Sequence, residues 1–89
     1  MTNAVLEGIQ HDPLAQAIAG ALALANEVAA ANGMNLAETR VAITEETLEG
    51  ALCWQIYYAP REYINVRGGD LSVYVDRDGT SVLRVLFGQ

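Results

Sequence analysis

Two segments of the chain carry residue types that occur in catalytic sites: the His11-Asp12 pair and the single cysteine, Cys53. A His–Asp pair can orient a general base, and a thiolate can act as a nucleophile. His11 and Asp12, however, directly precede an apolar helical pattern, where an aspartate caps free backbone amides. Cys53 lies in an alternating strand pattern, where a small residue at a partly covered position is expected. Neither segment therefore predicts an enzyme.

Motifs for metal ions and cofactors are weak. Asp76-x-Asp78-Gly79 resembles the beginning of a calcium-binding loop, but the further oxygen ligands and the final bidentate acid are missing. The same residues fit a hairpin turn between two strand patterns, because Asp-Gly favours such turns. The sequence has no cluster of histidines and cysteines with metal-site spacing. We therefore expect a non-enzyme that uses no cofactor and no metal ion.

Acidic and aromatic residues predict a binding surface instead. Glu45, Glu46 and Glu49 lie around a tight turn, where they are either solvated or bind arginines and lysines of a partner. By strand alternation, Tyr57 and Tyr74 face outward among small and polar neighbours. This composition is typical of an interface centre, although cross-strand packing within a monomer explains it equally well. The candidate protein-binding residues are Glu45, Glu46, Glu49, Tyr57, Tyr74, Arg84 and Leu86.

A long helix is predicted ahead of all strands. Asp12 and Pro13 are favourable residues for its first turn, and Asn32-Gly33 are favourable residues for its end. The helical period gathers the larger apolar residues on one side: Leu14, Ile18, Ala21, Leu22, Ala25, Val28 and Ala29. The opposite side is mostly alanine and nearly uncharged. It either faces water or packs closely on another chain.

Alternating apolar and polar residues predict three or four antiparallel strands after the helix. The turns are expected at Glu49-Gly50 and Asp78-Gly79. The residues expected to face the helix are Val41, Ile43, Leu52, Trp54, Ile56, Tyr58, Leu71, Val73, Val75, Leu83, Val85 and Phe87, whereas Val82 is expected to face outward.

These elements predict an α+β fold with two layers, in which one N-terminal helix packs on a three- to four-stranded antiparallel sheet. We expect a single domain over residues 1–89, with 1–11 as a flexible lead-in, 12–33 as the helix and 38–89 as the sheet. A single helix covers only one face of a sheet. The other face is therefore left to solvent or to a partner.

The charge and composition narrow the class of partner. The net charge of −6 resides entirely in residues 1–49, and the chain has no basic stripe, which argues against nucleic acid and favours a basic protein. Apolar residues make up 52% of the chain, slightly more than usual, which fits a homodimer. The stretch Pro13–Ala31 is apolar but interrupted by polar residues, and no export signal is visible. We therefore expect a cytoplasmic protein without membrane association.

The second half of the chain resembles two families of small bacterial modules. The pattern consists of Trp54-x-Ile56-x-Tyr58, then Leu71-x-Val73-x-Val75-Asp76-Arg77-Asp78-Gly79 and a final strand. It is similar to the immunity protein 35 family and to the PepSY propeptide domain, over Pro13–Phe87. The first resemblance implies a chain that binds and blocks a toxin. The second implies an exported or membrane-attached domain. The strand pattern of Arg40–Thr47 departs from both families.

Three hypotheses for function follow. The first is a small protein-binding module, such as an immunity or inhibitor protein, that uses the acidic turn and the outward sheet face. The second is a homodimeric structural protein that buries Val82, Leu86 and Tyr74, or the alanine side of the helix, against a second copy. The third is a small-molecule-binding domain with a pocket between helix and sheet near Trp54 and Tyr58.

Overall fold

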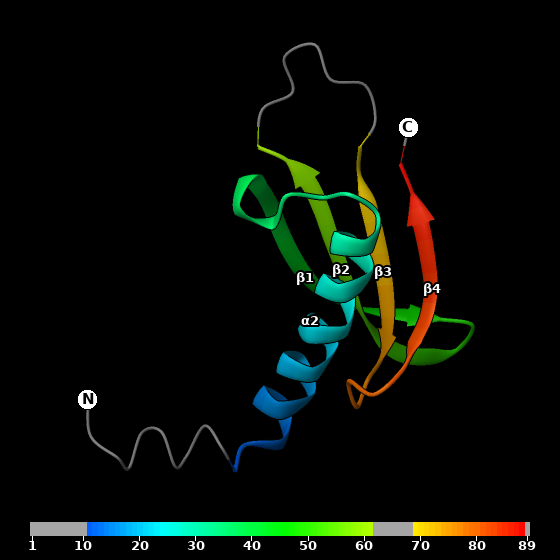
Figure 1. Cartoon of the computed structure of the whole chain (residues 1–89). Helices are drawn as coiled ribbons and strands as arrows, with labels where there is room; N and C mark the ends of the chain where they lie inside the picture. Colours follow the sequence, from blue (N-terminus) through cyan, green and yellow to red (C-terminus); the bar gives the residue numbers. More distant parts are fainter. Residues whose placement is uncertain (1–10, 62–68, 89) are drawn as a thin grey trace.

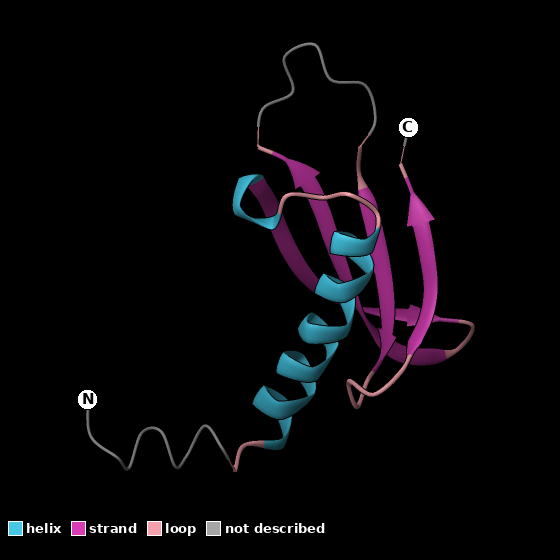
Figure 2. Cartoon of the chain, in the orientation of Figure 1, coloured by secondary structure: helices cyan, strands magenta, loops and turns pink. Residues whose placement is uncertain are grey.

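A helix lies across one face of a four-stranded antiparallel sheet (Figures 1 and 2). The computed structural model describes residues 11–61 and 69–88, so nearly all of the predicted lead-in lies outside the described residues. The elements are α2 (Pro13–Ala31), the 3-10 helix η1 (Leu36–Glu38), β1 (Thr39–Leu48), β2 (Ala51–Pro60), β3 (Leu71–Asp76) and β4 (Val82–Phe87). The strand order is β1-β2-β3-β4. The predicted α+β fold is confirmed, with four strands.

Helix α2 begins and ends at the residues that its sequence favours. The Asp12 carboxylate accepts hydrogen bonds from the backbone N–H groups of Leu14 at 2.9 Å and Ala15 at 3.3 Å. Pro13 occupies the first helical position, where its missing N–H leaves no bond unmade. Beyond the last turn, Gly33 adopts a φ of +85°, the left-handed conformation that ends many helices.

The helix meets the sheet through small residues rather than through its leucines. Its four buried residues form a stripe at intervals of four: Ala17, Ala21, Ala25 and Ala29. Leu14, which was predicted to face the sheet, is 47% exposed. The alanines bring the helix axis close to the sheet, and Ile18, Leu22, Leu24 and Val28 flank the stripe half-buried. The predicted inward side is therefore correct in part, but its centre is the alanine stripe.

A pair of glycines permits the closest approach of the helix to the sheet. A Cβ atom added to Gly20 of α2 would lie 2.6 Å from the carbonyl oxygen of Gly79, in the β3–β4 turn. A Cβ atom on Gly79 would lie 2.2 Å from the carbonyl oxygen of Ala17. The turn backbone therefore rests directly on the helix backbone, and neither position has room for a larger side chain.

The helix covers mainly the two central strands, and Val85 of β4 packs half-buried at the edge of the core. Trp54, Ile56 and Tyr58 of β2, together with Leu71, Val73 and Val75 of β3, are buried beneath the helix. Other residues predicted to be core lie beyond its edges and are exposed: Val41 (41%), Ile43 (37%), Leu52 (56%) and Phe87 (64%). The prediction that they are buried is wrong, because a single helix is too narrow to shield four strands.

A β-bulge changes one predicted orientation in β4. The register of β3 and β4 shifts between Tyr74 and Val75, so that Val75 lies opposite Val82. Val82 therefore shares the face of the helix, and Leu83 takes the extra position of the bulge. The prediction that Val82 faces outward is wrong, because strict alternation does not hold across a bulge. Leu83, which was predicted to be in the core, is 49% exposed.

The far end of the β1–β2 hairpin curls behind β3 and β4 in the view of Figure 1. An ion pair of 3.7 Å between Glu49, at the hairpin turn, and Arg84, on β4, joins the two regions. On the concave side of this curl, Leu48 is half-buried and Cys53 is fully buried. Leu52 points to the opposite side and is 56% exposed. The sheet face away from the helix is therefore partly sheltered by the chain itself, rather than bare.

Helix α2 is also long enough and apolar enough, by composition alone, to cross a membrane, with a mean hydropathy of 1.4. The core helix of a globular protein meets the same criterion. Here the alanine stripe lies against the sheet. The exposed side of the helix carries Gln16 and Glu27 among further alanines.

Candidate protein-binding surface

Four of the predicted site residues form one cluster on the sheet face away from α2, which we call the outer face. Gln55 and Arg84 lie on either side of Tyr74 in neighbouring strands. Ser72 lies between Tyr57 and Leu86 in the same way. Since residues directly opposite in antiparallel strands point to the same side, these side chains are neighbours. The outer patch consists of Tyr57, Tyr74, Arg84 and Leu86.

The exposure of the outer patch suits a contact surface. Leu86, near the end of the edge strand β4, is 46% exposed. Tyr57 and Tyr74 are half-buried, so their rings are already partly ordered by the surrounding sheet. The Tyr57 hydroxyl donates a hydrogen bond of 2.6 Å to Asp70, and the Gln55 amide donates one of 3.3 Å to Ser72. Binding a partner here therefore costs little side-chain entropy.

The hairpin turn adds an acidic rim to the outer patch. Glu49 forms its ion pair with Arg84 while its own side chain remains 83% exposed. Glu46 also points to the outer face, because it lies opposite Cys53 in the β1–β2 register. The structure thus gathers Glu46, Glu49 and the outer patch on one side of the molecule.

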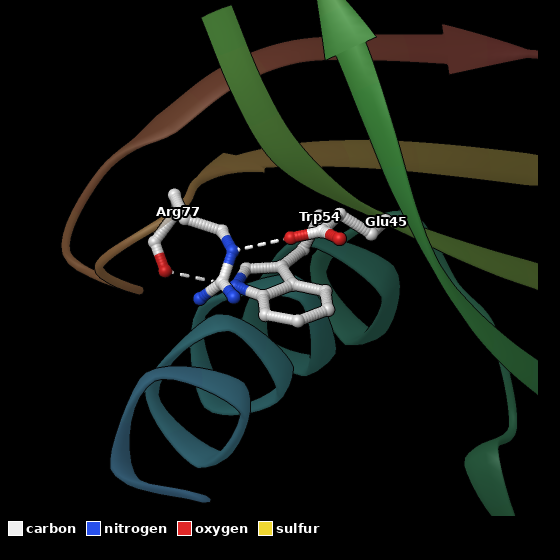
Figure 3. A network of polar contacts seen from close by, with 3 residues as sticks. All are labelled: Glu45, Trp54 and Arg77. Atoms are coloured by element: carbon white, nitrogen blue, oxygen red, sulfur yellow. Dashed lines mark hydrogen bonds and ion pairs between the residues drawn. The ribbon is translucent and has the colours of Figure 1, made fainter. Parts of the chain in front are cut away.

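Glu45 is the one predicted site residue that lies elsewhere. It lies opposite Trp54, on the side of the helix, where it accepts a hydrogen bond of 2.5 Å from the Nε of Arg77 (Figure 3). The Arg77 guanidinium lies 4.4 Å from the centroid of the Trp54 ring, and the Trp54 indole donates to the Arg77 carbonyl oxygen at 2.9 Å. Glu45 thus belongs to a structural network that ties the two hairpins together.

Sequence reasoning missed Arg77 and Asp70 as partners of predicted residues. Arg77 was treated only as part of a turn, whereas its side chain reaches both Trp54 and Glu45. Its position next to the Asp-Gly pair, just after a strand that adjoins Trp54, is the only sequence signal for this contact. Asp70 lies 13 residues from Tyr57, and nothing in its type or spacing indicates the bond between them.

The remaining chemical candidates have structural roles in the fold. Burial raises the pKa of the Cys53 thiol, and the nearby Glu46 carboxylate raises that pKa further. The protonated thiol is therefore favoured, and the thiolate required of a nucleophile is disfavoured. Asp12 caps α2, and His11 is exposed. Among residues 11–61 and 69–88, no group of three or more His, Cys, Asp or Glu side chains is arranged to hold a metal ion.

The region between helix and sheet, where a ligand pocket was hypothesised, is occupied by packed side chains. Trp54 is 6% exposed and Tyr58 is fully buried, and both belong to the core cluster with the alanine stripe. The Tyr58 hydroxyl donates a hydrogen bond of 2.6 Å to the amide oxygen of Asn26, and burial raises its pKa to about 12. Asn26 was expected on the opposite side of the helix. Its bond to Tyr58 corrects that expectation.

The described residues thus present a folded surface of tyrosine, arginine and leucine side chains with an acidic rim. Comparison of the chain with protein-family models, with curated proteins and with solved structures found no match.

Proposed function

We propose that this chain is a small protein-binding module that recognises its partner through the outer patch and the acidic rim. The observation that carries this proposal is the cluster of Tyr57, Tyr74, Arg84 and Leu86 on one curved face. Tyrosine and arginine are the residue types that most often dominate the binding energy of interfaces, and apolar neighbours exclude water around them.

Charge supports a basic protein as the partner. The chain carries a net charge of −6, and Glu46 and Glu49 border the outer patch with their side chains in solvent. Acidic groups at the rim of an interface speed association with a basic surface and suppress association with acidic ones. The same charge disfavours nucleic acid. In its most specific form, the proposal is a cytoplasmic immunity or inhibitor protein that blocks the partner by covering its functional surface.

The test compares two exposed leucines, Leu86 and Leu52, whose side chains point to opposite sides of the sheet. Leu86→Ser alters the outer patch, and Leu52→Ser alters the convex side of the β1–β2 hairpin, where the leucine is even more exposed. Tagged wild-type chain and both variants are used to capture proteins from the native host under gentle conditions. We expect one basic protein to be retained by the wild type and by Leu52→Ser, and to bind Leu86→Ser about tenfold more weakly.

The identity of the captured protein decides the more specific claim. An immunity or inhibitor role requires that the purified chain abolish a measurable toxic or enzymatic activity of that protein at equal molar amounts. Equal capture by Leu86→Ser and wild type would exclude the outer patch as the binding surface. Absence of any captured protein that is specific to the wild type would contradict the protein-binding proposal as a whole.

A further inference from the structure

Strand β1 forms one edge of the sheet. The strand order is β1-β2-β3-β4, so among the described strands β1 pairs with a neighbour on one side only. It is ten residues long, and Thr39 is its only buried residue. Val41 and Ile43 are 41% and 37% exposed on the side of the helix. An exposed edge strand of this length presents unpaired backbone groups that can pair with another strand.

The hydrogen-bond pattern identifies which backbone groups of β1 are unpaired within the sheet. The Arg61 N–H donates to the Glu38 carbonyl oxygen at 3.3 Å, and the β1–β2 register continues from there without a shift. Hydrogen-bonded pairs alternate along an antiparallel ladder, so the even-numbered residues of β1 bond to β2. The odd-numbered residues from Val41 to Thr47 therefore direct their N–H and C=O groups outward. Thr39 presents only its C=O group, because its N–H donates to the Leu36 carbonyl oxygen.

We propose that two copies of this chain associate through β1, antiparallel and with Ile43 opposite Ile43 of the second copy. In this register, the outward backbone groups of Val41, Ile43 and Glu45 each face a complementary group, and the Thr47 N–H faces the Thr39 C=O of the second copy. The pairing forms about eight interchain hydrogen bonds, within the range of a typical specific interface. The inference shares Glu46 with the acidic rim of the proposed partner-binding surface, but its test measures self-association of the purified chain, so failure of the dimer and failure of partner binding are distinguishable.

Charge complementarity selects this register. With Ile43 at the centre, Arg40 lies opposite Glu46 of the second copy, and by symmetry this pair occurs twice. Both residues are exposed and point to the outer face, and neither forms an ion pair within the described residues. Moving the second strand by two residues places Arg40 opposite Thr44 or opposite Leu48 instead. Among these three registers, only the Ile43-centred one matches the two outer-face charges of β1, Arg40 and Glu46, with each other.

The symmetry of the pair also settles how the two sheets join. A two-fold axis normal to the sheet keeps both helices on one side and both outer faces on the other. The result is one continuous eight-stranded sheet, and the two outer patches lie on the same surface. The exposed Val41 side chains lie opposite the stems of Glu45, and the two Ile43 side chains are in contact across the axis.

Strand β4 is the other edge, and it is the main competitor. It has six residues, and its single charged residue, Arg84, is already paired with Glu49 of the same chain. In an antiparallel pair centred on Arg84, the two arginines would face each other, which is unfavourable. A pair centred on Val85 places Arg84 opposite Leu86 and gains no ion pair. Charge complementarity therefore favours β1 over β4.

The test is a charge swap in the purified chain, measured by sedimentation equilibrium over a range of concentrations. The wild type is expected to reach twice the chain mass of 9.6 kDa. Arg40→Glu and Glu46→Arg each replace two attractive pairs by two repulsive ones, and each should raise the dimer dissociation constant at least about tenfold. The double variant Arg40→Glu/Glu46→Arg restores opposite charges and should dimerise within about threefold of the wild type.

Two further variants distinguish the edges. Arg84→Glu changes the same charge on β4 and should leave dimerisation unchanged. Ile43→Cys should form a covalent dimer on mild oxidation, since facing residues of hydrogen-bonded pairs lie about 5.5 Å apart, within disulfide range. Circular dichroism of each variant confirms the fold. A monomeric wild type, failure of the double variant to recover, or dissociation by Arg84→Glu alone would each overturn the proposal.

Discussion

The two hairpin turns of this molecule are built from similar residues but are fixed very differently. In the β3–β4 turn, the Asp76 carboxylate accepts hydrogen bonds from the Thr80 and Ser81 N–H groups at 2.7 and 2.8 Å, and from the Thr80 hydroxyl at 2.7 Å. Gly79 of that turn rests on the helix backbone. In the β1–β2 turn, Glu49 and Gly50 both have positive φ, and a Cβ added to Gly50 would meet nothing within 4 Å.

This difference means that the β3–β4 turn has a structural role, whereas the end of the β1–β2 hairpin is available for contact with a partner. The β3–β4 turn is held by the helix, by its own aspartate and by the Trp54 indole, so it positions β4 and leaves few polar groups free. Among the described residues, this end of the β1–β2 hairpin is joined to the later strands by the exposed ion pairs of Glu45 and Glu49, and Leu48 and Cys53 are sheltered on its concave side. Residues at that end can therefore meet a partner without disturbing the core.

The largest expected effect comes from the two turn glycines. Gly79→Ala adds a Cβ 2.2 Å from the Ala17 carbonyl oxygen at a φ of +76°, so the helix must move away from the turn. We expect it to cost about 5 kcal/mol or more of unfolding free energy. Gly50→Ala, at a φ of +85° in open space, should cost only about 1 kcal/mol. Urea unfolding measures the unfolding free energy of both variants, and similar losses in the two would refute the contrast between the turns.

Two residues of β2 give the next largest contrast. Trp54→Ala removes a ring that is 6% exposed and its bond to the β3–β4 turn, and should cost about 3–5 kcal/mol. Leu52→Ala, two positions along the same strand, removes a side chain that is 56% exposed and should cost less than about 0.5 kcal/mol. Denaturant titration measures both. A loss under about 1 kcal/mol for Trp54→Ala would show that Trp54 does not join the two hairpins.

Local patterns were sufficient to predict the elements of the fold. Asp12-Pro13 and Gly33 mark the helix ends through capping chemistry, and alternation placed Trp54, Ile56 and Tyr58 correctly in the core. The number of strands that the helix buries could not be predicted, because it depends on how the helix lies across the sheet in three dimensions. Gly20 is the sequence feature that could have indicated the close contact between helix and turn. Glycine is unfavourable inside a helix, and its presence there is typical of a close approach by another backbone.

The candidate site was predictable where it depends on strand parity, the alternation of side chains between the two faces of a strand. Tyr57 and Tyr74 share the outer face as their spacing requires, and the register brings Arg84 and Leu86 to them. Parity failed for Val82, because the bulge adds a residue that no residue type indicates. Glu45, Glu46 and Glu49 were grouped by sequence proximity, but Glu45 and Glu46 are neighbours in a strand and point to opposite sides. Glu49 lies in the turn, and the curl of the hairpin brings it to Arg84 on β4.

The acidic residue of the β3–β4 turn should have a moderate, pH-dependent effect. Partial burial of Asp76 raises its pKa, but hydrogen bonds from the Thr80 side chain and from the backbone of Ser81, Thr80 and Gly79 outweigh burial, so the pKa is lowered from 3.8. The stabilisation is therefore present above pH 3.8 and is lost as the pH falls through the lower, folded-state value.

Asp76→Ala should thus cost about 1.5–3 kcal/mol at neutral pH, since it removes hydrogen bonds to a charged acceptor. The difference from wild type should narrow as acid protonates Asp76 in the wild type. Asp78→Ala, at an exposed carboxylate two residues further along the same turn, is the matched control and should stay within about 0.5 kcal/mol. A difference that is constant from neutral to strongly acidic pH would show that the ionised carboxylate is not what holds the turn.

The smallest effect is expected where the two hairpins meet at an exposed ion pair. Glu45→Gln retains an acceptor for the Arg77 Nε–H but removes the charge, and the side chains of both residues are about two-fifths exposed, at 44% and 39%. Exposed pairs of this kind contribute about 0.2–1 kcal/mol, so the loss should fall in that range and shrink at high salt. Thermal unfolding at low and high salt measures it. If Glu45→Gln lost as much unfolding free energy as Trp54→Ala, Glu45 rather than the indole would hold the β1–β2 hairpin in place. The end of that hairpin would then be part of the structural core and not a surface free for contact.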